Sequence, residues 1–185
     1  MVVVEIRSNN KCVKMRLPNG HVVDVLSAVL DDINVWVQDQ PDKPESGGYI
    51  IGYQHQGTGN ISLEAVSPPC PMDIRTRVRF DLRDLEHQKY LEKARYRKSY
   101  YMGVWHTHPQ SVPIPSDLDW RDWNETMKLD QTGCGYVFFV IAGIKEWRLW
   151  VGDYMTGEIK EVYECPKEPS GLYIREVKEI GEKNN

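Results

Sequence analysis

The segment His106-Thr107-His108-Pro109-Gln110-Ser111-Val112-Pro113-Ile114-Pro115-Ser116-Asp117-Leu118-Asp119 places three potential metal ligands around a proline-rich loop. The preceding run, residues 100–105, is aromatic and apolar, which predicts a β-strand. Residues two apart on a strand point to the same face, so His106 and His108 would present their imidazoles side by side. Asp119 follows the loop and can fold back as a third ligand.

This segment supports two interpretations. Neutral imidazole and ionised carboxylate both bind zinc, and three protein ligands leave the fourth tetrahedral position for water, as in catalytic sites. An H-x-H pair alone is weak evidence for a metal. Ser116 with Asp119 three residues later is also the pattern of a helix N-cap with an acidic first turn. The two interpretations are compatible, because Ser116 can cap the helix while Asp119 turns inward.

The complete string, H-x-H-P followed by six residues and S-x-x-D, resembles the signature of the JAB/MPN-type zinc metalloproteases, also called JAMM proteases. That family also has a glutamate upstream, near a glycine-rich strand start. The segment Glu45-Ser46-Gly47-Gly48-Tyr49-Ile50-Ile51-Gly52 is similar to its E-x-G-G-x-x-x-G pattern. Two separated segments that match in the right order make the resemblance specific, and it extends roughly from Asp24 to Val151.

The resemblance implies a site and a mechanism. Zinc would be held by His106, His108 and Asp119. Glu45 would take a proton from the zinc-bound water, whose pKa zinc lowers to roughly 7, and later give it to the leaving amine. Ser116 would donate a hydrogen bond to the oxyanion.

Each of these roles has a simpler alternative. Taken alone, Glu45 is better explained as an exposed loop glutamate beside a turn, and Ser116 as a helix cap. Glu5 and Glu64 are rival candidates for the base, but each lies in a predicted strand and outside the glycine-rich context.

The pattern of elements predicts an α/β sandwich, in which a mixed, curved β-sheet is flanked by helices. The resemblance implies the same architecture, the JAB/MPN fold, a cytidine-deaminase-type sandwich with zinc at the sheet edge. The length of 185 residues predicts a single domain over residues 1–185, with a core at about 1–165 and a tail at 166–185. The size is similar to free-standing bacterial or phage-type members of the family.

Local sequence patterns predict further helices and strands. Apolar residues at helical spacing predict a helix from Val22 to about Val37, although its β-branched residues have low helix propensity. The charged segment at 84–98 predicts a second helix with His87 on its surface. Arg75, Arg77 and Arg79 alternate along a predicted strand, so they form either a solvated face or a groove wall that binds an acidic partner. Short strands are predicted at 2–6 and 172–177.

Composition restricts the environment and the partners. The net charge of -4 provides no general attraction to nucleic acid or to an anionic membrane. Four cysteines lie apart without a C-x-x-C pair, as is typical of reduced thiols. We recognise no signal peptide and no apolar stretch long enough to span a bilayer. These features predict a cytoplasmic protein that binds neither nucleic acid nor membrane.

The resemblance also implies an activity. The family is known for cutting isopeptide bonds between the C-terminus of a ubiquitin-like protein and a lysine. Some bacterial members reverse such conjugation in anti-phage operons, where a cyclic-nucleotide-producing nucleotidyltransferase is itself conjugated through its C-terminus. We therefore expect a deconjugating isopeptidase with a ubiquitin-like or C-terminally conjugated protein as its substrate. Two alternatives remain: release of a tail from a sulfur-carrier-type protein, and a non-catalytic MPN-type scaffold.

Overall fold

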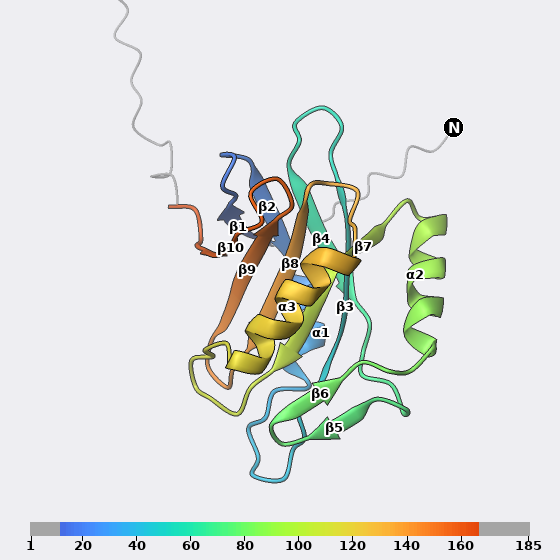
Figure 1. Ribbon diagram of the computed structural model, residues 1–185, viewed down its shortest axis with the longest axis vertical. Coiled ribbons are helices and arrows are strands. Elements are labelled where there is room, and N and C mark those ends of the chain that lie inside the picture. Colours follow the sequence, from blue (N-terminus) through green and yellow to red (C-terminus); the bar gives the residue numbers. More distant parts are fainter. Residues whose placement is uncertain (1–11, 167–185) are drawn as a thin grey trace, which may run out of the picture.

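The fold is built on one curved, mixed sheet (Figure 1). The computed structural model describes residues 12–166, so the strands predicted at 2–6 and 172–177, and Glu5, lie outside the described residues. The strand order is β1-β2-β4-β3-β7-β8-β9-β10. The strands are β1 (Cys12–Arg16), β2 (Val22–Leu26), β3 (Gly47–Gln54), β4 (Ile61–Val66), β7 (Tyr100–Thr107), β8 (Tyr136–Ala142), β9 (Trp147–Asp153) and β10 (Ile159–Val162).

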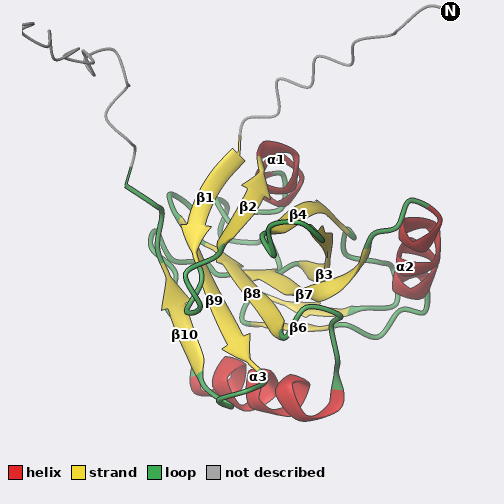
Figure 2. Cartoon of the chain, turned by 90° about the horizontal axis from the view of Figure 1, so that it is seen from above, coloured by secondary structure: helices red, strands yellow, loops and turns green. Residues whose placement is uncertain are grey.

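Helices cover the two faces of the sheet, as predicted. The helices are α1 (Ser27–Asn34), α2 (Glu86–Tyr96) and α3 (Asp117–Leu129). Figure 2 shows α1 and α3 on opposite faces, while α2 lies to one side, where it contacts β3 and β7. A separate hairpin of β5 (Ile74–Thr76) and β6 (Arg79–Asp81) precedes α2. Within residues 12–166, no helix is long and apolar enough to cross a membrane.

Strand β8 forms the centre of both hydrophobic cores. All seven of its residues are buried, as the near-continuous apolar run at 136–142 requires of a strand covered on both faces. Phe138 and Val140 pack into the core beneath α1. Phe139 and Ile141 point the other way and pack with Trp123 of α3. The period-two alternation of β8 therefore joins the two layers on either side of the sheet.

The prediction of a helix from Val22 was wrong in its first half. Residues 22–26 form β2, which pairs antiparallel with β1 and parallel with β4, and the helix begins only at Ser27. Val23 and Val25 are fully buried in the sheet. A run of β-branched residues fits a pleated, buried surface better than a helix, and the tertiary pairing decides between the two periodicities.

Strands β3 and β7 bring the two predicted motifs together. They pair antiparallel, with Gly47 opposite His106. The paired glycines of the first motif allow close backbone approach. A Cβ atom on Gly47 would lie 2.6 Å from the carbonyl oxygen of Trp105, and one on Gly48 would lie 2.2 Å from that of Ser67. Any other residue at Gly47 would push β3 away from β7, and any other residue at Gly48 would push β3 away from the segment that follows β4.

The arginines of the β5–β6 hairpin do not form the predicted basic strand face. The segment folds back on itself between Thr76 and Arg79. Arg75 donates to the backbone oxygen of Glu45, and Arg77 donates to that of Gln40. Arg79 pairs with Asp81 of the same strand at 2.7 Å. Each of the three arginines therefore makes a different local contact.

A buried cluster fixes this hairpin segment to α2. His87, predicted on the surface, is fully buried and bridges Ser67 Oγ (2.8 Å) and Asp73 Oδ2 (2.9 Å). The Asp73 carboxylate also accepts backbone N–H bonds from Cys70, Arg83 and Asp84. Cys70, Asp73 and His87 are close enough to form a metal-binding group. Hydrogen bonds already satisfy the carboxylate, and burial raises the pKa of the Cys70 thiol to about 11, so the cluster fits a structural role.

We predict that Asp73→Asn lowers the free energy of unfolding by about 1–3 kcal/mol at pH 7. Burial alone would raise the pKa of Asp73, but its hydrogen bonds outweigh burial and lower the pKa. The stabilisation is therefore present above the unfolded-state pKa of about 4 and is lost as the pH falls through the folded-state value. Urea unfolding of parent and variant should show a difference that is largest near pH 7 and shrinks below about pH 4. An equal effect of Asp42→Asn, at an exposed position, would contradict this prediction.

Candidate active site

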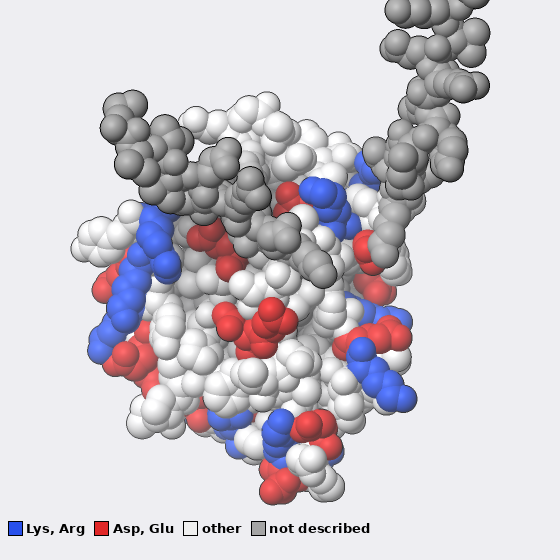
Figure 3. Space-filling model, turned by 180° about the vertical axis from the view of Figure 1, so that it is seen from behind, with Lys and Arg blue, Asp and Glu red and all other residues white. Residues whose placement is uncertain are grey.

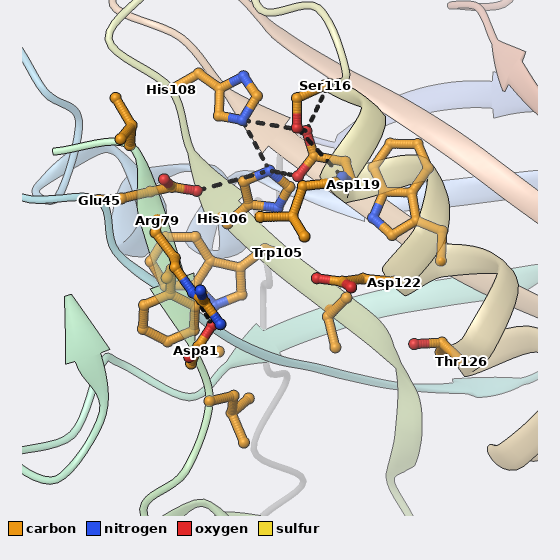
Figure 4. Close-up of a pocket in the computed structure, with 17 residues that line it drawn as sticks. Glu45, Arg79, Asp81, Trp105, His106, His108, Ser116, Asp119, Asp122 and Thr126 are labelled. Carbon is orange, nitrogen blue, oxygen red and sulfur yellow. Dashed lines mark hydrogen bonds and ion pairs between the residues drawn. The ribbon is translucent and has the colours of Figure 1, made fainter. Parts of the chain in front are cut away.

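The candidate site lies where β7 ends and α3 begins, at the end of the sheet (Figure 4). His106 belongs to β7, His108 follows it directly, and Asp119 lies in the first turn of α3. Glu45 immediately precedes Ser46 and β3, and the pairing of β3 with β7 carries it to the histidines. Glu45, His106 and His108 are each less than a tenth exposed. These four of the five site residues predicted from sequence are therefore brought together.

Potential metal-binding atoms of three residues lie close to one another. His106 Nε2 lies 3.1 Å from His108 Nε2 and 3.0 Å from Asp119 Oδ1, and His108 Nε2 lies 3.4 Å from Asp119 Oδ2. Ligands bound to a tetrahedral zinc at ordinary bond lengths are about 3.3–3.4 Å apart. Two imidazole nitrogens and a carboxylate are also a donor set that zinc favours. The arrangement therefore fits a metal ion of this kind.

Two carboxylates compete for the place of third ligand. Glu45, His106 and His108 also form a group whose ligand atoms lie within 4.8 Å of one another. However, Glu45 Oε1 is 3.9 Å from His106 Nε2, whereas Asp119 approaches both imidazoles at 3.0 and 3.4 Å. The distances favour Asp119 over Glu45 as the third ligand, because the Glu45 carboxylate lies farther from the histidine nitrogens.

Ser116 and Asp119 also form the predicted helix cap. The Ser116 hydroxyl accepts the backbone N–H of Asp119, and Asp119 Oδ2 accepts from the Ser116 backbone N–H at 2.5 Å, which completes a capping box. The Ser116 hydroxyl also donates to Asp119 Oδ2 at 2.6 Å. The cap thus fixes the direction of the Asp119 carboxylate, while its other oxygen, Oδ1, faces His106.

Burial and charge act differently on the two carboxylates. Burial raises the pKa of Glu45 to about 7, although the nearby histidines oppose the rise. Burial would also raise the pKa of Asp119, but hydrogen bonds from His106 and His108 outweigh it and lower that pKa. A carboxyl group with a pKa near neutrality can both accept and release a proton. Asp119 instead stays ionised, the form in which a carboxylate can bind a metal.

A pocket of about 300 Å³ opens beside these residues, between α3 and the β5–β6 hairpin. Figure 4 shows Arg79 and Asp81 of β6 along one side of the pocket and Asp122 and Thr126 of α3 along the other. Sequence reasoning missed Asp81, Asp122 and Thr126, because nothing local indicates that the hairpin lies against α3. Arg79 does line the pocket, as the groove-wall alternative for the hairpin arginines allows. On the face seen in Figure 3, basic side chains lie among acidic ones.

The chain matches a family of known proteins. Residues 28–151 match the family of prokaryotic homologs of the JAB domain, and the chain belongs to that family. A protein of Escherichia coli (strain TW11681) named "CD-NTase/cGAS isopeptidase" is 27% identical over 78% of this chain and 88% of its own length. A Vibrio cholerae protein of the same name is 34% identical over 59% of this chain and 67% of its own length.

The fold has a solved relative as well. A protein of Desulfitobacterium hafniense, whose solution structure is known, superimposes with a TM-score of 0.51 and 16% sequence identity. The match covers 74% of this chain and 87% of that protein. This likeness supports the architecture alone.

We predict that the two carboxylates differ in their effect on metal content. Asp119→Ala should lose the metal because it removes a ligand, whereas Glu45→Gln should keep about one ion per chain. Elemental mass spectrometry on protein never exposed to chelator measures this, with circular dichroism to confirm folding. Loss of metal from Glu45→Gln and its retention in Asp119→Ala would reverse the assignment of the two residues.

Proposed function

We propose that this protein is a zinc-dependent isopeptidase that cuts the amide bond between the C-terminus of a conjugated protein and a target lysine. Its site residues would be His106, His108 and Asp119 as metal ligands, Glu45 as general base and acid, and Ser116 as a donor to the oxyanion. The observation that carries the proposal is the convergence of three residues, His106, His108 and Asp119, whose nitrogen and oxygen atoms approach one another at 3.0–3.4 Å. A second, buried carboxylate lies 3.9 Å from His106.

The proposed chemistry is amide hydrolysis. A bound zinc ion supplies Lewis acidity, which polarises the scissile carbonyl and makes a water molecule easier to deprotonate. Glu45 takes a proton from the attacking water as the new carbon–oxygen bond forms. As the carbon–nitrogen bond breaks, Glu45 gives the proton to the leaving lysine amine. The Ser116 hydroxyl would turn from Asp119 toward the oxyanion and donate its hydrogen bond there.

The relatives narrow the substrate class. Several carry the name "CD-NTase/cGAS isopeptidase" at 27–34% identity, which favours a nucleotidyltransferase of that class, conjugated through its C-terminus, as the substrate. The protein would then reverse conjugation in bacterial antiviral defence. We place it in the cytoplasm, where thiols stay reduced, because none of its four cysteines forms a disulfide.

We expect the purified protein to cleave a conjugate in which the C-terminal carboxylate of a CD-NTase is joined to a lysine of a carrier protein. Glu45→Gln should lower kcat by about 10²–10⁴-fold, because it removes the proton acceptor. The measurement is gel and mass-spectrometric detection of the released C-terminus and the free lysine.

Glu64→Gln is the matched control, because Glu64 lies on β4 and accepts a hydrogen bond from Ser99, away from the pocket residues. It should cleave at the parent rate. A Glu45→Gln variant as fast as the parent would exclude the proposed base. A parent that releases only a sulfur-carrier tail would favour that alternative, and one that binds conjugates without cutting any would favour a scaffold.

A further inference from the structure

The backbone of Glu45 and Ser46 is held on every side. The Glu45 N–H donates to the Thr76 carbonyl at 2.7 Å, and the Glu45 carbonyl accepts from Arg75 Nε at 3.0 Å. The Ser46 N–H donates to Thr107 Oγ1 at 3.0 Å, and the Ser46 carbonyl accepts from the Thr107 N–H at 2.8 Å. All four backbone polar groups of the segment that carries Glu45 are therefore used, two by the hairpin and two by Thr107.

Thr107 lies between the two histidines but points away from them. On a strand its side chain faces opposite to those of its neighbours, so its hydroxyl lies behind the site. It is fully buried and does not line the pocket. A backbone N–H can only donate, so the Thr107 oxygen is the acceptor of the bond from Ser46. Its single hydrogen is then available for one further bond.

Gln38 accepts that hydrogen. Its Nε2 donates to the carbonyl oxygens of Arg77 (2.8 Å) and Lys43 (3.2 Å), which fixes the orientation of the amide and leaves Oε1 as the acceptor for Thr107 at 3.2 Å. Gln38 is only 1% exposed. Its amide thus connects the loop before Glu45, the β5–β6 hairpin and the strand of the histidines.

Arg75 closes the network from the other side. Besides the Glu45 carbonyl, its guanidinium binds Ser46 Oγ through Nη2 and lies over the Trp36 ring, 5.3 Å from the ring centroid. A planar guanidinium that makes two hydrogen bonds and a ring contact is held in one geometry. The segment is therefore fixed relative to both the hairpin and β7.

We propose that Thr107 is a positioning residue, which together with Gln38 and Arg75 sets the Glu45 carboxylate against the metal-binding histidines. The inference rests on the proposed function. Because the network lies behind the site, it acts on the placement of the base and leaves substrate binding and the metal ligands unchanged. Small misplacements of reacting groups cost up to about 100-fold in rate.

The test compares two substitutions at Thr107 on the CD-NTase–lysine conjugate. Thr107→Val keeps the shape and removes the hydroxyl, so kcat should fall about 10- to 100-fold with KM and zinc content unchanged. Thr107→Ser keeps the hydroxyl and should restore most of the rate. Arg75→Lys, at the half-buried hairpin, should also lower kcat at constant KM. Thr132→Val, which removes a half-buried hydroxyl bonded to the Tyr136 carbonyl, should leave kcat unchanged.

A second measurement does not depend on activity. Amide hydrogen exchange at Ser46 should be faster in Thr107→Val and unchanged in Thr107→Ser, because the threonine oxygen is the partner of that amide. Parent kcat in both Thr107→Val and Arg75→Lys, or an equal loss in Thr107→Ser, would overturn the positioning role, as would unchanged Ser46 exchange. An inactive parent with the expected exchange pattern would overturn the proposed function instead, and leave Thr107 as a structural link.

Discussion

The antiparallel pairing of β3 with β7 is the constraint on which the rest of the structure depends. It sets Gly47 opposite His106, so the residues that precede β3 meet the residues that follow β7. Glu45, about sixty residues before the two histidines, thereby comes within 3.9 Å of His106, and the ligand atoms of Glu45, His106 and His108 all lie within 4.8 Å of one another. The absence of a side chain at Gly47 permits this approach, because a Cβ atom there would meet the carbonyl oxygen of Trp105 on β7.

Two sets of hydrogen bonds, on opposite sides of the β3–β7 pairing, fix the site residues. In front, the capping box of α3 directs Asp119 toward the histidines. Behind, hydrogen bonds through Thr107 and Gln38 tie the Glu45 segment to β7 and to the hairpin. Polar groups buried in this way stabilise a single geometry only when each is satisfied, and these are. The site is thus held by rigid elements rather than by its own loop.

Much of this arrangement could be predicted from the sequence, for physical reasons. The run at 136–142 is too apolar to face water on either side. The strand predicted before His106 places His106 and His108 on the same face, because they are two residues apart. Ser116 and Asp119 stand at capping-box spacing, which fixes the Asp119 carboxylate locally. The glycines beside Glu45 indicated close backbone approach, and the structure shows what they approach.

Other features depend on contacts that leave no local pattern. Val22 to Leu26 suits either a helix or a strand, and pairing with β1 and β4 decides it. His87 looks like a surface residue until Asp73 and Ser67 surround it. Nothing in the sequence around Thr107 indicates its partner Gln38, which lies 69 positions away. Long-range polar contacts of this kind follow from the folded chain alone.

The most direct test of the central claim, a zinc site built by β7 and α3, is X-ray absorption at the zinc edge of protein purified with its metal. We predict a first shell of nitrogen and oxygen at about 2.0–2.2 Å, with the outer-shell scattering of two imidazoles. Scattering from a sulfur at about 2.3 Å would contradict it. That result would place the metal on a cysteine, as at the Cys70, Asp73 and His87 cluster, and would remove the basis for hydrolysis at His106 and His108.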